Sequence, residues 1–177
     1  DFDEVRLYQP GDDLRSVDWR VTARRNMPHT KVFKEERERP IYIVVDFRSS
    51  MYFGTRVAFK SVVAAKIAAI MSWAAVEAGD RVGALFITTT GSIILRPQPR
   101  QKAALMILKK MADITQRQPE HYHSSVEVVV DSFKMLTQVI RPNGLVFLIS
   151  DFQGIDAVTL SVLQTIAQKQ QLVSVMV

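Results

Sequence analysis

The chain has 177 residues, of which 47% are hydrophobic and 23% are charged, and it contains no cysteine. This composition is typical of a globular protein, and the lack of cysteine excludes disulfides, thiolate metal sites and a thiol nucleophile. The net charge of +5 is scattered, without a basic stripe interleaved with aromatic residues, so we expect a generally basic surface and no nucleic-acid partner.

Residues 1–40 form a polar segment with nine basic and nine acidic residues. Within it, DDLRSVDWR predicts a helix N-cap followed by a short helix with Leu14, Val17 and Val21 facing inward. The run KVFKEERE indicates an extended segment. We expect residues 1–40 to pack on the rest of the chain as an N-terminal extension, with Trp19 largely buried as its anchor.

From Ile41 onward, apolar runs alternate with helical patterns. Short apolar runs bounded by Asp, Gly or Pro predict strands at 41–45, 81–88, 92–97, 144–150 and 172–177. Longer patterns predict helices at 57–78, 99–112, 124–140 and 156–169, the first ending at Gly79.

This order of elements predicts an α/β domain over residues 41–177, Rossmann-like, with a doubly wound and mainly parallel sheet. The turn TTGS between the second and third strands indicates a hairpin. The strand at 92–97 is therefore predicted to be an antiparallel edge strand beside 81–88. Arg96–Pro97 is expected to end it, because proline cannot donate a further ladder hydrogen bond.

The longest apolar stretch, 57–78, contains Lys60, Lys66 and Glu77, so it is not predicted to span a membrane. The chain begins without Met and stops inside the apolar run LVSVMV. We therefore expect a piece of a longer protein, truncated at its C-terminus. A cytoplasmic location is expected, with membrane association through an anchor outside this fragment as the alternative.

Two predicted strands end in an aspartate, Asp46 after IYIVV and Asp151 after GLVFLIS. Ligands of open α/β sheets bind beyond the carboxyl ends of the strands, so both carboxylates are expected at one rim. Asp46 begins the run DFRSSM, in which Arg48 precedes the hydroxyls of Ser49 and Ser50. The alternative is structural, with each Asp accepting hydrogen bonds from loop amides.

The pattern of an Asp, a hydroxyl at +4, a long helix, a Gly-Asp-Arg-Val-Gly strand and a later strand-terminal Asp resembles a von Willebrand factor A domain. The segments YQPGDDLRSVDWRVTARR, PHTKVFKEERERP and DFRSSMYFGT resemble the bacterial domain-of-unknown-function family 58. That family commonly occurs beside MoxR-type AAA+ ATPases, so the resemblance implies such an ATPase as partner. It implies no molecular activity.

Many von Willebrand A domains hold Mg²⁺ or Mn²⁺ in a metal-ion-dependent adhesion site built from Asp-x-Ser-x-Ser, a Thr and a late Asp, all oxygen ligands. By the resemblance, Asp46, Ser50 and Asp151 match the first Asp, the second Ser and the late Asp. Ser124 is the best match to the Thr. It also begins the capping box S-x-x-E with Glu127, which alone would explain this serine.

Arg48 stands where the first Ser ligand is expected. A guanidinium ~5 Å from a divalent ion costs about 7 kcal/mol of repulsion at an effective dielectric constant near 20. Between the two carboxylates it could instead neutralise both through paired hydrogen bonds. We therefore expect a degenerate site that binds Mg²⁺ or Mn²⁺ weakly or not at all, with a working cation site as the alternative.

The sequence contains no P-loop, GxGxxG, HExxH or supported Ser-His-Asp arrangement. The favoured hypothesis is a non-enzymatic protein–protein interaction module that uses the strand-end rim, working with a MoxR-type ATPase. The first alternative is a metal-dependent hydrolase or phosphotransferase that uses Asp46 and Asp151. The second is a mainly structural domain of a membrane-anchored or envelope-linked protein.

Overall fold

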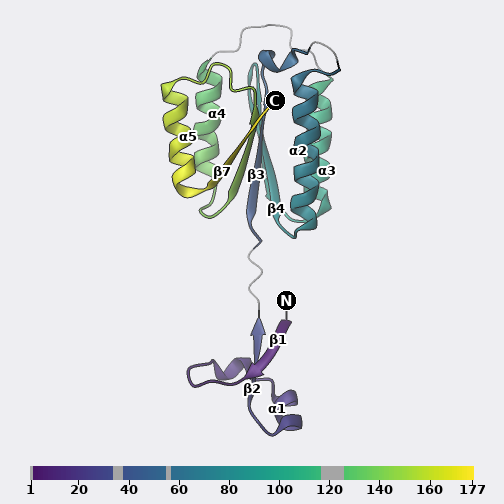
Figure 1. Ribbon diagram of the computed structural model, residues 1–177, viewed down its shortest axis with the longest axis vertical. Helices are drawn as coiled ribbons and strands as arrows, with labels where there is room; N and C mark the ends of the chain where they lie inside the picture. Colours follow the sequence, from purple (N-terminus) through teal and green to yellow (C-terminus); the bar gives the residue numbers. More distant parts are fainter. Residues whose placement is uncertain (1, 34–37, 55–56, 117–125) are drawn as a thin grey trace. The chain divides into compact units, whose positions relative to one another are not determined.

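The computed structural model describes residues 2–33, 38–54, 57–116 and 126–177, drawn in colour in Figure 1. These residues belong to two compact units, 1–37 and 38–177. The boundary lies three residues before the predicted one, because Arg39 is held by the second unit. Its backbone N–H donates to Asp80 Oδ1 at 3.0 Å, and its Nη2 donates to Gly144 O at 3.3 Å.

The first unit contains a two-stranded antiparallel sheet of β1 (Phe2–Leu7) and β2 (His29–Phe33). A 3-10 turn, Leu14–Ser16, and helix α1 (Trp19–Arg25) lie between these strands in the sequence. The predicted single helix is therefore wrong: it is two pieces, each with its own N-cap, Asp13 and Asp18. Val17 separates them because its extended backbone bridges to Thr30.

Val17 is 7% exposed and faces inward as predicted, whereas Leu14 is 65% exposed. Within its own unit Trp19 is 70% exposed, and its predicted burial against the rest of the chain stays a prediction. A two-stranded sheet with a two-turn helix offers too little surface to bury an indole. The packing of residues 1–40 on the rest of the chain stays a prediction.

In the described part of the second unit, five strands form one sheet in the order β5-β4-β3-β6-β7. All neighbouring pairs are parallel except β4 with β5. The strands are β3 (Pro40–Phe47), β4 (Arg81–Thr88), β5 (Gly91–Gln98), β6 (Leu145–Ser150) and β7 (Gln171–Met176).

Helices cover both faces of this sheet (Figure 1). One face carries α2 (Lys60–Glu77) and α3 (Gln101–Thr115), and the other carries α4 (Val126–Val139) and α5 (Ala157–Lys169). Ile43 and Val45 of β3 join the core cluster beneath α2 and α3, while Val44 joins the cluster beneath α4 and α5. This two-sided burial explains why IYIVV is continuously apolar and does not alternate, and it confirms the predicted doubly wound sheet.

β5 is the predicted antiparallel edge strand, but it does not stop at Arg96–Pro97. It runs on to Gln98 through an irregularity in its pairing with β4 between Val82 and Ala84. Proline is tolerated at such a bulge because no ladder donor is required there. Gly83 lies opposite, where an added Cβ would be 2.6 Å from Leu95 O and 2.7 Å from Pro97 N.

Among the described residues, no helix combines the length and the apolar character needed to cross a bilayer.

We predict that Gly83→Ala destabilises the second unit by about 1–3 kcal/mol, as is usual for overpacking in a closed site. The added methyl meets backbone atoms of β5, which cannot rotate away as a flexible side chain would. Urea unfolding followed by circular dichroism measures the loss. Thr90→Ala, at an exposed position of the same hairpin, is the control. Equal stability of both variants with the parent would show that the bulge relaxes freely.

Candidate functional site

Asp46 lies near the carboxyl end of β3 and is 1% exposed. Its Oδ1 accepts from the backbone N–H of Arg48 at 2.9 Å and from Arg48 Nε at 3.0 Å. Its Oδ2 accepts from Arg48 Nη2 at 2.7 Å and from Ser150 Oγ at 2.7 Å. Both oxygens of this buried carboxylate are therefore fully engaged within the protein.

Arg48 is 4% exposed and folds back on the carboxylate two residues before it. Its backbone is extended and precedes the 3-10 turn Ser49–Tyr52, which returns the chain towards α2. Nη2 also donates to Gln153 O at 3.0 Å, in the loop after β6. The guanidinium thus bridges the ends of two neighbouring strands, as fits a buried arginine with a planar set of donors.

Asp151 follows β6 and has its own cation. Lys60 Nζ donates to its Oδ2 at 3.2 Å, while Ser50 Oγ at 3.4 Å and the N–H of Gln153 at 3.2 Å donate to Oδ1. The carboxylate side chain is 2% exposed and that of Lys60 is 29% exposed. Arg48 therefore pairs with one predicted carboxylate, and a different residue neutralises the other.

Sequence reasoning missed Lys60 and Ser150. A signal for Lys60 existed, because it is the first residue of α2 and a cation in the first turn opposes the helix dipole unless a carboxylate compensates. No signal marked Ser150, whose Oγ also accepts the N–H of Phe152 at 2.9 Å.

Of the residues predicted by resemblance, Asp46, Ser50 and Asp151 meet at one rim together with Arg48. The expected position of Arg48 beside a carboxylate is confirmed for Asp46. Ser124, the predicted match to the Thr, lies outside the described residues. So does the expected N-terminal end of the 124–140 helix, since α4 is described from Val126.

This donor set does not fit a hard divalent cation. The lone pairs of Asp46 are directed at Arg48 and Ser150, and the carboxylate of Asp151 faces an ammonium group. The hollow left beside Asp46, Arg48 and Phe133 has a volume of about 10 Å³, at the lower limit for one water molecule. A divalent ion would have to displace two cations of the protein before it met its ligands.

The profile of the family described as "Protein of unknown function DUF58" matches residues 4–177. "Uncharacterized protein Rv1480" of Mycobacterium tuberculosis is 33% identical over 151 residues, which are 85% of this chain and 46% of that protein. The chain thus spans about half the length of the curated relatives it matches.

Two crystal structures from Bacteroides share the fold. The conserved hypothetical protein BatB of B. thetaiotaomicron has a TM-score of 0.58 at 10% identity, over 78% of this chain and 66% of that one. An aerotolerance-related membrane protein of B. fragilis has a TM-score of 0.59 at 11% identity, over 78% and 67%. The predicted α/β fold, with a mainly parallel sheet and one antiparallel edge strand, is confirmed.

We predict that Arg48→Met destabilises the protein by about 3–5 kcal/mol, because it leaves a buried carboxylate without its counter-charge. Adding Asp46→Asn removes that charge and is expected to restore much of the loss. Denaturant unfolding of both single variants and the double variant gives the coupling. The exposed pair Asp131 and Lys134, changed in the same way, is the control and should lose below about 1 kcal/mol. Additive losses at the buried pair would contradict the predicted coupling.

Proposed function

The chain belongs to the family of proteins of unknown function DUF58, and we propose that its von Willebrand A-like unit is a non-enzymatic protein-interaction module that works without a metal ion. The observation that carries this proposal is the separate neutralisation of Asp46 by Arg48 and of Asp151 by Lys60. In a metal-dependent adhesion site the matching carboxylates hold a metal ion, and a carboxylate of the partner completes the coordination shell of that ion. Here two side chains supply that positive charge.

A groove beside Lys60 provides a surface for such a partner. It has a volume of about 470 Å³ and is lined by apolar side chains, among them Phe53, Val57 and Val63, with Lys66 at its border. Phe53 is 62% exposed and Val57 is 98% exposed. Neighbouring exposed apolar groups on a folded domain are typical of protein-binding surfaces. The charge of Lys66 favours a partner segment that combines apolar and acidic residues.

The proposed partner is a MoxR-type AAA+ ATPase, on the strength of the family resemblance. Membrane association of the whole protein is proposed with it, since the similar chain from B. fragilis is described as a membrane protein.

The alternative of a metal-dependent hydrolase or phosphotransferase has less support from the geometry. A nucleophilic or metal-binding Asp46 would have to give up its hydrogen bonds to Arg48 and Ser150 inside a site that is closed to solvent. Among the described residues of the rim, no contact favours the release of Asp46 from these hydrogen bonds.

We predict that a MoxR-type ATPase from the same genome is captured by the immobilised protein equally well with EDTA and with Mg²⁺, both in nucleotide-free buffer. Phe53→Ser combined with Val57→Ser should weaken capture about tenfold or more, as expected for central apolar contacts. Leu160→Ser on α5, which removes an exposed leucine on the other face of the sheet, is the matched control. Loss of capture in EDTA would contradict the metal-free mode, and an unchanged double variant would contradict the groove.

We also predict that the parent shows no micromolar affinity for Mg²⁺ or Mn²⁺ in calorimetric titration. Arg48→Ser restores the Asp-x-Ser-x-Ser pattern, and Lys60→Ala frees the carboxylate of Asp151. The combined variant should bind Mn²⁺ at least tenfold more tightly, which needs relief of only ~1.4 kcal/mol of repulsion. Its melting temperature should also rise with Mn²⁺. Micromolar binding of Mg²⁺ or Mn²⁺ by the parent would contradict the proposed role of the two cations. So would a folded variant whose affinity for Mn²⁺ does not exceed that of the parent.

A further inference from the structure

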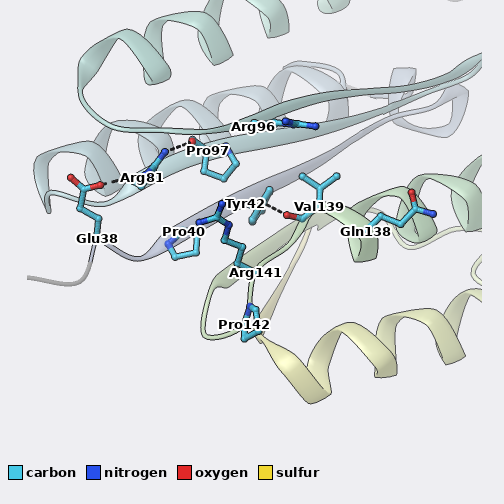
Figure 2. A pocket seen from close by; sticks show the side chains of 10 residues that line it. All are labelled: Glu38, Pro40, Tyr42, Arg81, Arg96, Pro97, Gln138, Val139, Arg141 and Pro142. Atoms are coloured by element: carbon cyan, nitrogen blue, oxygen red, sulfur yellow. Dashed lines mark hydrogen bonds and ion pairs between the residues drawn. The ribbon is translucent and has the colours of Figure 1, made fainter.

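A second hollow lies at the opposite end of the sheet, where β3 and β4 begin and β5 and α4 end (Figure 2). Its volume is about 500 Å³, within the range of small-molecule sites. The rings of Pro40, Pro97 and Pro142 form parts of its wall. Tyr42, 2% exposed, lies at its base and donates from its hydroxyl to Val139 O at 3.0 Å.

Three arginines from three different segments line this hollow: Arg81 of β4, Arg96 of β5 and Arg141 of the loop after α4. One carboxylate, Glu38, accompanies them, so the lining carries a net charge of +2. Glu38 pairs loosely with Arg81 at 3.9 Å, and Arg81 Nη2 also donates to Pro97 O at 3.3 Å. Within the described residues, Arg96 and Arg141 have no carboxylate partner.

The backbone that bears Arg141 is held in place by a buried glutamine. Gln170, 7% exposed, donates from Nε2 to Arg141 O at 2.6 Å and accepts the N–H of Gly144 at its Oε1 at 2.6 Å. Arg81 stands on β4 in register with Pro40 of β3, and Arg96 lies in β5 at the irregularity opposite Gly83. Hydrogen bonds thus hold the main chain at Arg81 and Arg141, which lowers the ordering cost of binding a ligand.

The three arginines also act electrostatically on Tyr42. Burial raises the pKa of the Tyr42 hydroxyl, while the positive charges of Arg141, Arg96 and Arg81 oppose that rise. The phenol at the base of the hollow therefore lies in the electrostatic field of all three guanidiniums.

We propose that this arginine pocket, lined by Arg81, Arg96 and Arg141, binds a small molecule that carries two or more phosphate groups. Planar guanidinium donors match phosphate oxygens in pairs. Arg96 and Arg141, which have no carboxylate partner among the described residues, offer one set of paired donors to each of two phosphate groups. The hollow shape favours a compact ligand over an extended acidic peptide, and the site is independent of the rim proposed above.

Inorganic pyrophosphate is the probe, titrated calorimetrically into the whole chain in magnesium-free buffer at low ionic strength. We expect saturable binding with one site per chain. Arg96→Ala and Arg141→Ala should each weaken it about tenfold, the effect of losing a charged hydrogen bond. Arg141→Lys should bind pyrophosphate more tightly than Arg141→Ala, because it keeps the positive charge. It should bind more weakly than the parent, because it lacks the paired donors of the guanidinium. Circular dichroism confirms that each exposed-site variant is folded.

Lys109→Ala, an exposed charge on α3 away from the hollow, is the matched control and should leave binding unchanged. Equal weakening by this control would show attraction to net charge alone and overturn the proposal. No pyrophosphate binding at millimolar concentration would also overturn it. So would a hexaglutamate peptide that binds more tightly than pyrophosphate and loses affinity with the same two arginine variants, since the hollow would then be a peptide site.

Discussion

The burial of one carboxylate constrains the whole rim of the sheet. β3 is covered by helices on both faces, so Asp46 near its carboxyl end is removed from water together with the apolar residues before it. An ionised carboxylate in such a place costs several kcal/mol unless paired groups surround it. Arg48 and Ser150 supply those groups, and Arg48 in turn reaches the loop after β6. The charge of Asp46 thereby connects the end of β3, the 3-10 turn and the loop after β6.

The two ends of the sheet differ in electrostatic character, although the same parallel topology creates both. At the carboxyl end, two carboxylates meet two cations, and the charge of the cluster is balanced. At the amino end, three guanidiniums face a single carboxylate. A parallel sheet gathers residues from the starts of distant segments as effectively as from their ends. The end of the sheet opposite the usual ligand site of such folds therefore also brings charged side chains together.

The fold of residues 38–177 was predictable because its strands and helices carry strong local patterns. The run IYIVV, the hairpin turn TTGS and Gly79 after the long helix each indicated the element that the structure contains. At the site, Asp46, Ser50 and Asp151 were predictable from their positions after strands. The position of Lys60 in the first turn of α2 signalled a carboxylate partner, but its identity could not be read locally, because Asp151 is 91 residues away. The helix break at Val17 and the continuation of β5 past Pro97 depend on pairing with another strand, which no local pattern reports. The convergence of Arg81, Arg96 and Arg141 is a tertiary event of the same kind.

The bulge at Pro97 also bears on how the protein avoids self-association. β5 is an edge strand of the described sheet, and an edge strand with free N–H and C=O groups is a template for the strand of another molecule. The irregular pairing opposite Gly83, where Pro97 has no N–H to donate, interrupts the regular spacing of that edge. The charge of Arg96 next to it adds repulsion between copies. Because Leu95 and Pro97 approach Gly83 so closely, no side chain fits at position 83 while the bulge is kept. The absence of a side chain on the inner strand β4 therefore helps to keep the outer strand irregular, and with it the edge protected against pairing with another molecule.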